Sequence, residues 1–157
     1  MKKFFKLLFI FFTILGCTND NVDCTTPPEP LIFQFIDKDS GENLFSNGTF
    51  DSKQELIIID LKTARHIQVS TLTSENAYSL SIGNIGWNSE NISYGILFFN
   101  KNYIYFTLNV DAQRITEKCS YTKYNSVEIK NLEYQYDNNT GIYKIFIETK
   151  NKKELKI

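Results

Sequence analysis

Residues 103–110 alternate between apolar and polar side chains with a period of two, and this pattern limits the fold more than any other part of the chain. One face holds Ile104, Phe106, Leu108 and Val110, and the other holds Tyr103, Tyr105, Thr107 and Asn109. Such alternation predicts a β-strand with one buried and one solvated face. The apolar face of such a strand needs a second layer to cover it, so the pattern favours packed sheets.

Other short segments rich in Ile, Phe, Tyr, Val and Thr also have strand character, and Asn, Gly, Asp and Ser separate them. They are residues 31–36, 56–59, 65–71, 77–82 and 96–99. In 65–71, alternation turns Ile67 and Val69 inward. The only candidate for a helical turn is the stretch 111–118.

The C-terminal part of the chain predicts a change of direction followed by a hairpin. Val127 and Ile129 share one parity, whereas Leu132 and Tyr134 share the other, so a bend or bulge is expected near Asn131. The turn residues at 137–141 then lead into a strand at 142–149. With about eight short strands and no amphipathic helix, the sequence predicts a single antiparallel β-sandwich, with a closed β-barrel as the alternative.

The N-terminus has the layout of an export signal. Lys2, Lys3 and Lys6 form a cationic head, residues 7–15 are almost wholly apolar, and Gly16 ends the run. The run is shorter than the roughly 20 residues that a transmembrane helix needs, so we expect no membrane span in the mature protein.

The last four residues of this region, Ile14-Leu15-Gly16-Cys17, resemble the bacterial lipobox. The resemblance implies cleavage before Cys17, diacylglycerol on its sulfur and a further acyl chain on the new amino group. Two or three acyl chains hold a protein stably on a membrane, whereas one binds reversibly. The alternatives are an ordinary secretory signal or a buried apolar strand.

The chain therefore divides into a signal at 1–16, a polar, Pro-rich tether at 17–30, a β-domain at 31–150 and a flexible tail at 151–157. Thr18 follows Cys17 where some inner-membrane lipoproteins carry aspartate, so the outer membrane is the expected location rather than the inner one. The lipobox, the acidic tether and the opening of the domain resemble small lipoproteins of Bacteroidetes-type bacteria, most of which have no assigned activity. This resemblance implies a cell-envelope location and a β-domain, and it carries over no catalytic residues.

The mature chain is mildly acidic, with 14 basic residues against 18 acidic ones. A formal charge of −4 predicts no nucleic-acid partner. Membrane lipid is then expected to be contacted through acylated Cys17 alone.

Two cysteines remain besides Cys17. In an oxidising compartment, Cys24 in the tether and Cys119 in the domain can form a disulfide. The alternative is a buried Cys119 that packs as a small apolar residue while Cys24 stays reduced.

No catalytic or metal-binding motif stands out, and no cofactor is expected. His66, the only histidine, falls on the polar face of its segment, and no Gly-x-Ser-x-Gly elbow accompanies it. Residues 37–42 begin like a calcium-binding loop, but the glycine is misplaced and position 12 is Gly48 rather than glutamate, so we interpret the segment as a turn. Eighteen acidic residues leave carboxylate chemistry open without singling out a pair.

Aromatic residues offer one possible binding surface. Trp87 lies in a glycine-rich loop, and together with Tyr103 and Tyr105 it can form a platform that stacks on sugars or on a partner. The alternative is that Trp87 covers the core and that the tyrosines reflect β-propensity. The sequence thus favours an envelope lipoprotein whose β-domain binds or scaffolds an envelope protein or a glycan without catalysis, with a carboxylate-dependent hydrolase, such as a glycosidase, as the alternative.

Overall fold

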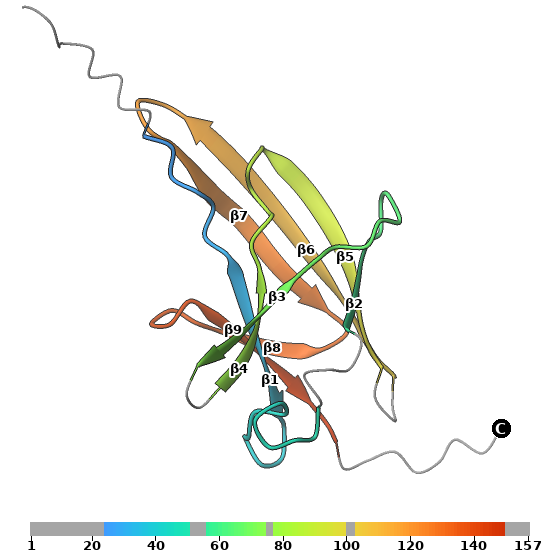
Figure 1. The fold of residues 1–157 in the computed structure, drawn as a ribbon. Coiled ribbons are helices and arrows are strands. Elements are labelled where there is room, and N and C mark those ends of the chain that lie inside the picture. Colours follow the sequence, from blue (N-terminus) through green and yellow to red (C-terminus); the bar gives the residue numbers. More distant parts are fainter. Residues whose placement is uncertain (1–23, 51–55, 75–76, 100–102, 150–157) are drawn as a thin grey trace, which may run out of the picture.

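The computed structural model describes residues 24–50, 56–74, 77–99 and 103–149. Cys17, the predicted signal at 1–16, the first part of the tether at 17–23 and the predicted tail at 151–157 lie outside these ranges. Within them the chain forms nine strands in two sheets, with no helix and no closed barrel (Figure 1). The predicted all-β sandwich is therefore confirmed, and the barrel alternative is not observed.

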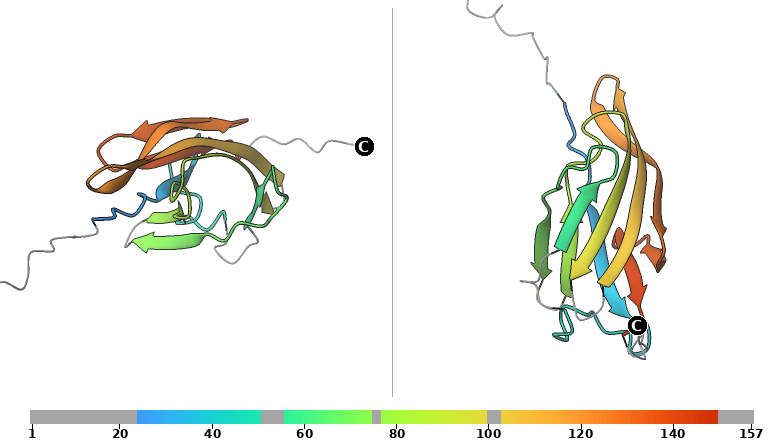
Figure 2. Two further views of the ribbon diagram at one scale, coloured as in Figure 1. Left: turned by 90° about the horizontal axis from the view of Figure 1, so that it is seen from above. Right: turned by 90° about the vertical axis from the view of Figure 1, so that its right-hand side faces the viewer.

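The two sheets lie face to face, as the two views in Figure 2 show. The four-stranded sheet has the order β2 (Leu56–Asp60), β5 (Glu90–Phe99), β6 (Tyr103–Thr116) and β7 (Ser120–Lys130). The five-stranded sheet has the order β3 (Ser70–Ser74), β4 (Ala77–Ile82), β1 (Leu31–Asp37), β9 (Ile142–Ile147) and β8 (Glu133–Asp137).

One strand pair departs from the predicted antiparallel arrangement. β1 and β9, the first and last strands, run parallel in the five-stranded sheet, in register from Ile32 beside Ile142 to Asp37 beside Ile147. Every other paired strand is antiparallel. Parallel neighbours need a long connection between them, and here the whole of the domain between β1 and β9 supplies it.

The alternation in 103–110 determines the core. Phe106, Leu108 and Val110 are buried, whereas Tyr105 on the opposite face is 47% exposed. The buried face meets Phe35 of the other sheet, whose ring centroid lies 6.1 Å from that of Phe106 and 4.6 Å from that of Phe98 on the neighbouring strand β5. Edge-to-face and offset aromatic contacts of this kind join the two layers.

Two predicted segments differ from the structure. Residues 65–69 form no strand; only His66 makes an isolated bridge to Ile59, and β3 begins at Ser70. Ile67 and Val69 nevertheless pack against the core, and the amide of Ile67 donates to the carbonyl of Ile58 on β2 at 2.9 Å. The alternation therefore predicted burial correctly, although the segment pairs with β2 only at this short bridge. The helical turn expected at 111–118 is also wrong, because β6 continues to Thr116 and pairs with β7 throughout.

β7 contains one bulge, and the chain bends directly after this strand. Between Asp111 and Ala112 the register shifts, because Asn125 of β7 is an extra residue in the backbone pairing, although its side-chain amide lies 3.3 Å from a carboxylate oxygen of Asp111. Such a bulge increases the local twist of the two strands. The bend expected near Asn131 is present: Asn131 has φ 75°, and at this residue the chain leaves β7 in one sheet to begin β8 in the other.

Candidate functional site

The end of the predicted tether is attached to the sandwich. Residues 24–30, here called the strap, run beside the start of β7, where Thr25 forms a parallel bridge with Ser120. The amide of Thr26 donates to the carbonyl of Ser120 at 2.8 Å, and the amide of Ser120 donates to the carbonyl of Cys24 at 3.0 Å. A disulfide joins Cys24 to Cys119, with the two Cα atoms 4.8 Å apart. This is the first of the two alternatives that the sequence left open.

Side chains of the sandwich also hold the strap. Arg114 donates from Nη1 to the carbonyl oxygen of Thr26 at 2.7 Å, and the hydroxyl of Tyr124 lies 2.7 Å from the carbonyl oxygen of Glu29. Burial, followed by the nearby charge of Glu29, raises the pKa of Tyr124, which therefore stays a neutral donor. Pro28 is buried. The strap is thus part of the folded domain.

The loop between β4 and β5 packs against β7 and the strap. We call the disulfide, the hydrogen bonds to the strap and these loop contacts together the clamp, because they hold the strap on the sandwich. Gly86 has φ +90°, and a Cβ at this position would lie 2.5 Å from Cγ2 of Thr122 and 3.5 Å from Cβ of Pro28. The hydroxyl of Thr122 donates to the carbonyl of Gly86 at 2.6 Å. Only glycine fits both the backbone conformation and the space.

Trp87 and Tyr105, two of the three residues of the predicted aromatic platform, are not brought together. Trp87 is 51% exposed, and its ring lies 5.9 Å from the guanidinium carbon of Arg114, near the strap. Tyr105 lies nine residues before Arg114 on the same strand, which corresponds to about 30 Å. The side chain of Tyr103 is outside the described part of the structure. Alternation with a period of two predicts which face of a sheet a side chain occupies. It does not predict how far a loop residue such as Trp87 lies from a strand residue such as Tyr105.

Tyr105 lies on the outer face of the four-stranded sheet, where its ring packs over Gly95. A Cβ at Gly95 would lie 3.0 Å from Cδ2 of Leu61 and 3.3 Å from the ring of Tyr105. Leu61 is 50% exposed. These three residues form a small apolar patch at the surface.

A tyrosine cluster on β8 and β9 was not foreseen from the sequence. The ring centroids of Tyr136 and Tyr134 lie 4.6 Å and 6.4 Å from that of Tyr143. Burial, followed by the neighbouring tyrosines, raises the pKa of Tyr143 to about 12. The cluster covers Phe33 of the core, 5.5 Å from Tyr143, and so serves packing.

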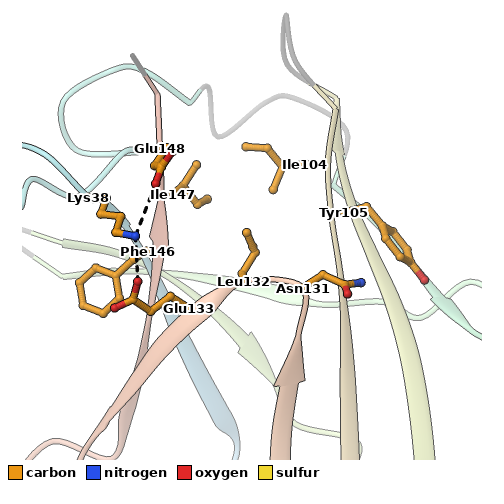
Figure 3. A pocket seen from close by; sticks show the side chains of 9 residues that line it. All are labelled: Lys38, Ile104, Tyr105, Asn131, Leu132, Glu133, Phe146, Ile147 and Glu148. Atoms are coloured by element: carbon orange, nitrogen blue, oxygen red, sulfur yellow. Dashed lines mark hydrogen bonds and ion pairs between the residues drawn. The ribbon is translucent and has the colours of Figure 1, made fainter. Parts of the chain in front are cut away.

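Figure 3 shows an open pocket of about 370 Å³. The start of β6 and the end of β9, which contribute to its lining, lie at the end of the sandwich opposite the strap (Figure 1). The pocket opens between the start of β6, the start of β8 and the residues that end β9. Its lining is Lys38, Ile104, Tyr105, Asn131, Leu132, Glu133, Phe146, Ile147 and Glu148. In Figure 3, Ile104, Leu132 and Ile147 converge on the hollow, whereas the ring of Tyr105 points away from it.

An ion-pair network forms one rim of the pocket. Nζ of Lys38 lies 2.9 Å from Oε2 of Glu133 and 3.4 Å from Oε1 of Glu148. Hydrogen bonds to Glu133, its charge, and then the same contributions from Glu148 raise the pKa of Lys38. The three side chains are between 44% and 64% exposed, so the network is accessible to solvent.

The parallel pairing of β1 with β9 creates this rim. Asp37 and Ile147 are partners at the end of that pair, so the next residues, Lys38 and Glu148, emerge side by side. The amide of Lys38 donates to the carbonyl of Ile147 at 2.9 Å and fixes this arrangement. Glu133 arrives from the first position of β8, which is paired with β9 at Phe146. No local pattern links these positions, so the sequence alone did not indicate them.

The remaining candidate residues show no catalytic or metal-binding arrangement. His66 is exposed. The calcium-like segment forms a turn, in which Oδ1 of Asp37 accepts hydrogen bonds of 2.9 Å from the amides of Asp39 and Ser40. Across the ranges that the structure covers, no group of three potential metal ligands is present. No helix in those ranges has the length and apolar character to cross a membrane.

The comparisons with known proteins found no matching family model, no similar curated protein and no similar solved structure.

Proposed function

We propose that this protein is a lipid-anchored protein of the bacterial cell envelope, and that it binds another envelope protein through the pocket end of its sandwich without catalysing a reaction. The pocket carries this proposal, because it combines an aliphatic floor with a charged rim. Ile104, Leu132 and Ile147 offer an apolar contact area, and Lys38 with its two glutamates surrounds one side. Interfaces between proteins commonly have such an apolar centre and polar rim.

The membrane anchor rests on the lipobox-like sequence at 14–17. The disulfide between Cys24 and Cys119 supports an oxidising compartment, because such bonds persist outside the cytosol. Thr18 after the acylated cysteine favours the outer membrane over the inner one. These points lead to an envelope protein held by lipid at its N-terminus.

A glycan is the less favoured partner. Sugar-binding surfaces usually present aromatic faces for stacking. Trp87 lies beside Arg114, and Arg114 is about 30 Å from Tyr105 along β6. The two rings in the pocket lining do not form such a surface: Tyr105 points away from the hollow, and the ring of Phe146 lies beside Lys38 and Glu133, whereas the residues that converge on the hollow are aliphatic. An apolar side chain of a protein partner fits that lining better.

The hydrolase alternative has one observation in its favour. Glu133 and Glu148 both contact the ammonium of Lys38, so their carboxylates lie within roughly 10 Å of each other, the upper limit for the two acids of glycosidases. The ammonium of Lys38 lies between the two carboxylates. A glycosidase needs one of its two acids in the protonated form, because that acid donates a proton to the leaving group. If the alternative is correct, cell-wall or envelope glycans should be cleaved by the purified protein, and Glu133→Gln and Glu148→Gln should each abolish the cleavage.

Site-specific photo-crosslinking in living cells tests the binding proposal. A photoreactive residue at Asn131, which lines the pocket, should form a crosslinked product with an envelope protein, and one at Tyr121, which is exposed elsewhere, should not. Leu132→Ser and Lys38→Glu should each remove the product at position 131, whereas Leu61→Ser on the outer sheet face should leave it. A product that persists in both pocket variants, or no product at 131, overturns the proposal. Binding to a glycan array that the pocket variants lose would instead favour a glycan partner.

Intact mass tests the anchor. The purified mature protein should have the mass of residues 17–157 plus one diacylglyceryl group, with or without a further acyl chain on the amino group, and Cys17→Ala should remain as an unacylated precursor. A Cys17→Ala variant that is processed and fractionates like the wild type would refute lipidation.

A further inference from the structure

We propose that the clamped strap orients the domain on its membrane: it keeps the hairpin between β6 and β7 beside the lipid and turns the pocket end toward the aqueous phase. The proposal rests on the lipid anchor proposed above. It identifies the pocket's partner as one that approaches from outside the membrane surface rather than from within the bilayer.

The strap makes the membrane linker short. Seven residue steps separate Cys17 from Cys24, so a fully extended linker reaches about 25 Å. Because Cys24 is bonded to Cys119 at the start of β7, the linker begins at one end of the sandwich. Figure 1 shows the strap and the β6–β7 hairpin at one end, and the ends of β1 and β9 with the start of β6 at the other.

The sandwich is longer than this linker. From Ile104 at the pocket to Thr116 near the hairpin, β6 runs for twelve residue steps, or about 40 Å. An inverted domain, with its pocket on the lipid, would hold Cys24 too far above the membrane for the linker to reach. The inverted orientation is therefore excluded, and averaged over the orientations that remain, from upright to reclining, the hairpin lies nearer the lipid than the pocket end does.

Without the clamp this restriction disappears. If the strap is released as far as Leu31, fourteen residue steps separate the domain from Cys17, and the extended linker reaches about 50 Å. That length exceeds the extent of β6, so the domain can turn over. The contacts that prevent this are the disulfide, the backbone bridge at Ser120, and the bonds from Arg114 and Tyr124 to strap carbonyls.

Energy transfer to the membrane measures this orientation. The full-length acylated protein is placed in lipid vesicles that contain an acceptor dye, and a donor dye is attached to a non-canonical residue at position 39 or at position 117. Asp39 lies in the exposed turn after β1 at the pocket end, and Glu117 lies in the hairpin at the strap end. In the clamped protein we expect strong transfer from 117 and weak transfer from 39.

Two kinds of variant should reduce that difference. Cys24→Ser with Cys119→Ser, Arg114→Ala and Tyr124→Phe releases the strap, and insertion of seven Gly and Ser residues between Asn21 and Val22 lengthens the linker while the clamp stays intact. Both should raise transfer from position 39 and broaden its distribution. The insertion serves as the test even if the quadruple variant does not fold.

The outcomes separate this inference from the anchor itself. Mass measurement on the same samples shows whether Cys17 is acylated, and an unacylated product overturns both the anchor and the orientation. For acylated protein, equal transfer from 39 and 117 in the clamped form refutes the orientation. A difference that persists unchanged in the insertion variant shows that the strap does not set it, and this also refutes the proposal.

Discussion

The amide of Ala64 donates to the carbonyl oxygen of Asp60 at 2.7 Å, and Ala64 has φ 56°, a left-handed conformation that alanine rarely adopts. Asp60 ends β2, and its carboxylate accepts from the amide of Lys62 at 2.8 Å. The same turn follows two other strands. In both, an aspartate ends the strand and a left-handed glycine lies four residues later: Asp37 with Gly41 (φ 74°) and Asp137 with Gly141 (φ 71°).

Ala64→Gly should therefore stabilise the protein. The left-handed conformation costs an L-residue about 1–2 kcal/mol, and the greater freedom of glycine in the unfolded chain offsets about 0.5–1 kcal/mol of the gain. We expect the free energy of unfolding to rise by about 0.5–1 kcal/mol. Urea unfolding measures it, and the matched change Gly141→Ala should shift stability in the opposite direction. A loss of stability in Ala64→Gly would contradict the argument.

Of these turns, some could be predicted from the sequence and one could not. The turn at 137–141 was readable because glycine marks it, whereas alanine at position 64 conceals the equivalent turn. Alternation predicted the core of β6 correctly, since burial of one face requires only local information. It failed at 65–69, because Ile67 and Val69 reach the core from a segment that pairs with β2 only at an isolated bridge and forms no strand.

The pocket depends on information that no local pattern contains. β1 and β9 are separated by more than a hundred residues, and only packing of the complete core brings them side by side. Lys38 and Glu148 meet because of that pairing. The aromatic platform failed for a related reason: Trp87 and Tyr105 were assigned to a loop and a face, and their separation depends on the length and course of β6.

Asp37 should make stability sensitive to acid. Hydrogen bonds from the Thr149 hydroxyl and then from the amide of Ser40 lower its pKa from 3.8 to about 2. Because the folded-state pKa lies below the unfolded one, the stabilisation is complete above about pH 4 and is lost as the pH falls from about 4 to 2. In Asp37→Asn, the free energy of unfolding should be lower at neutral pH and should decline less across this range.

Chemical denaturation at a series of pH values between 2 and 7 measures this dependence. Asp39→Asn removes a neighbouring exposed carboxylate in the same turn and should leave the acid dependence close to that of the wild type. If Asp37→Asn and the wild type lose stability in parallel between pH 4 and pH 2, Asp37 does not cause the acid sensitivity.

The disulfide should contribute strongly to stability. It joins two cysteines that are 95 residues apart in the sequence. Closing such a loop lowers the conformational entropy of the unfolded chain, and this stabilises the folded protein by up to about 4–5 kcal/mol. We expect Cys24→Ala with Cys119→Ala to lower the free energy of unfolding by about 2–4 kcal/mol, since the other strap contacts remain. Unfolding with and without dithiothreitol measures it: reduction should destabilise the wild type to the level of the double variant and leave that variant unchanged. A wild type that is insensitive to reduction would contradict the bond.

Gly86→Ala should disrupt the clamp through one steric contact. The new methyl group would lie 2.5 Å from Cγ2 of Thr122, and φ +90° is unfavourable for alanine. Gly48→Ala is the matched control, because its φ is +78° and nothing lies within 4 Å of the added carbon. We expect a loss of about 1–2 kcal/mol in the control, from the backbone alone, and a further loss of about 1–3 kcal/mol in Gly86→Ala, from overpacking.

A second substitution identifies the contact responsible. Thr122→Ser removes Cγ2 but keeps the hydroxyl that donates to the carbonyl of Gly86 and accepts from Arg114. The nearest atoms to the methyl group added by Gly86→Ala would then be Cβ of residue 122 and Cβ of Pro28, both at the ordinary distance of 3.5 Å. In a double-mutant cycle, Thr122→Ser should therefore restore most of the steric part of the loss while the backbone part remains. If the two losses simply add, Thr122 does not limit the space at Gly86, and the close packing of the strap loop against β7 has been misassigned.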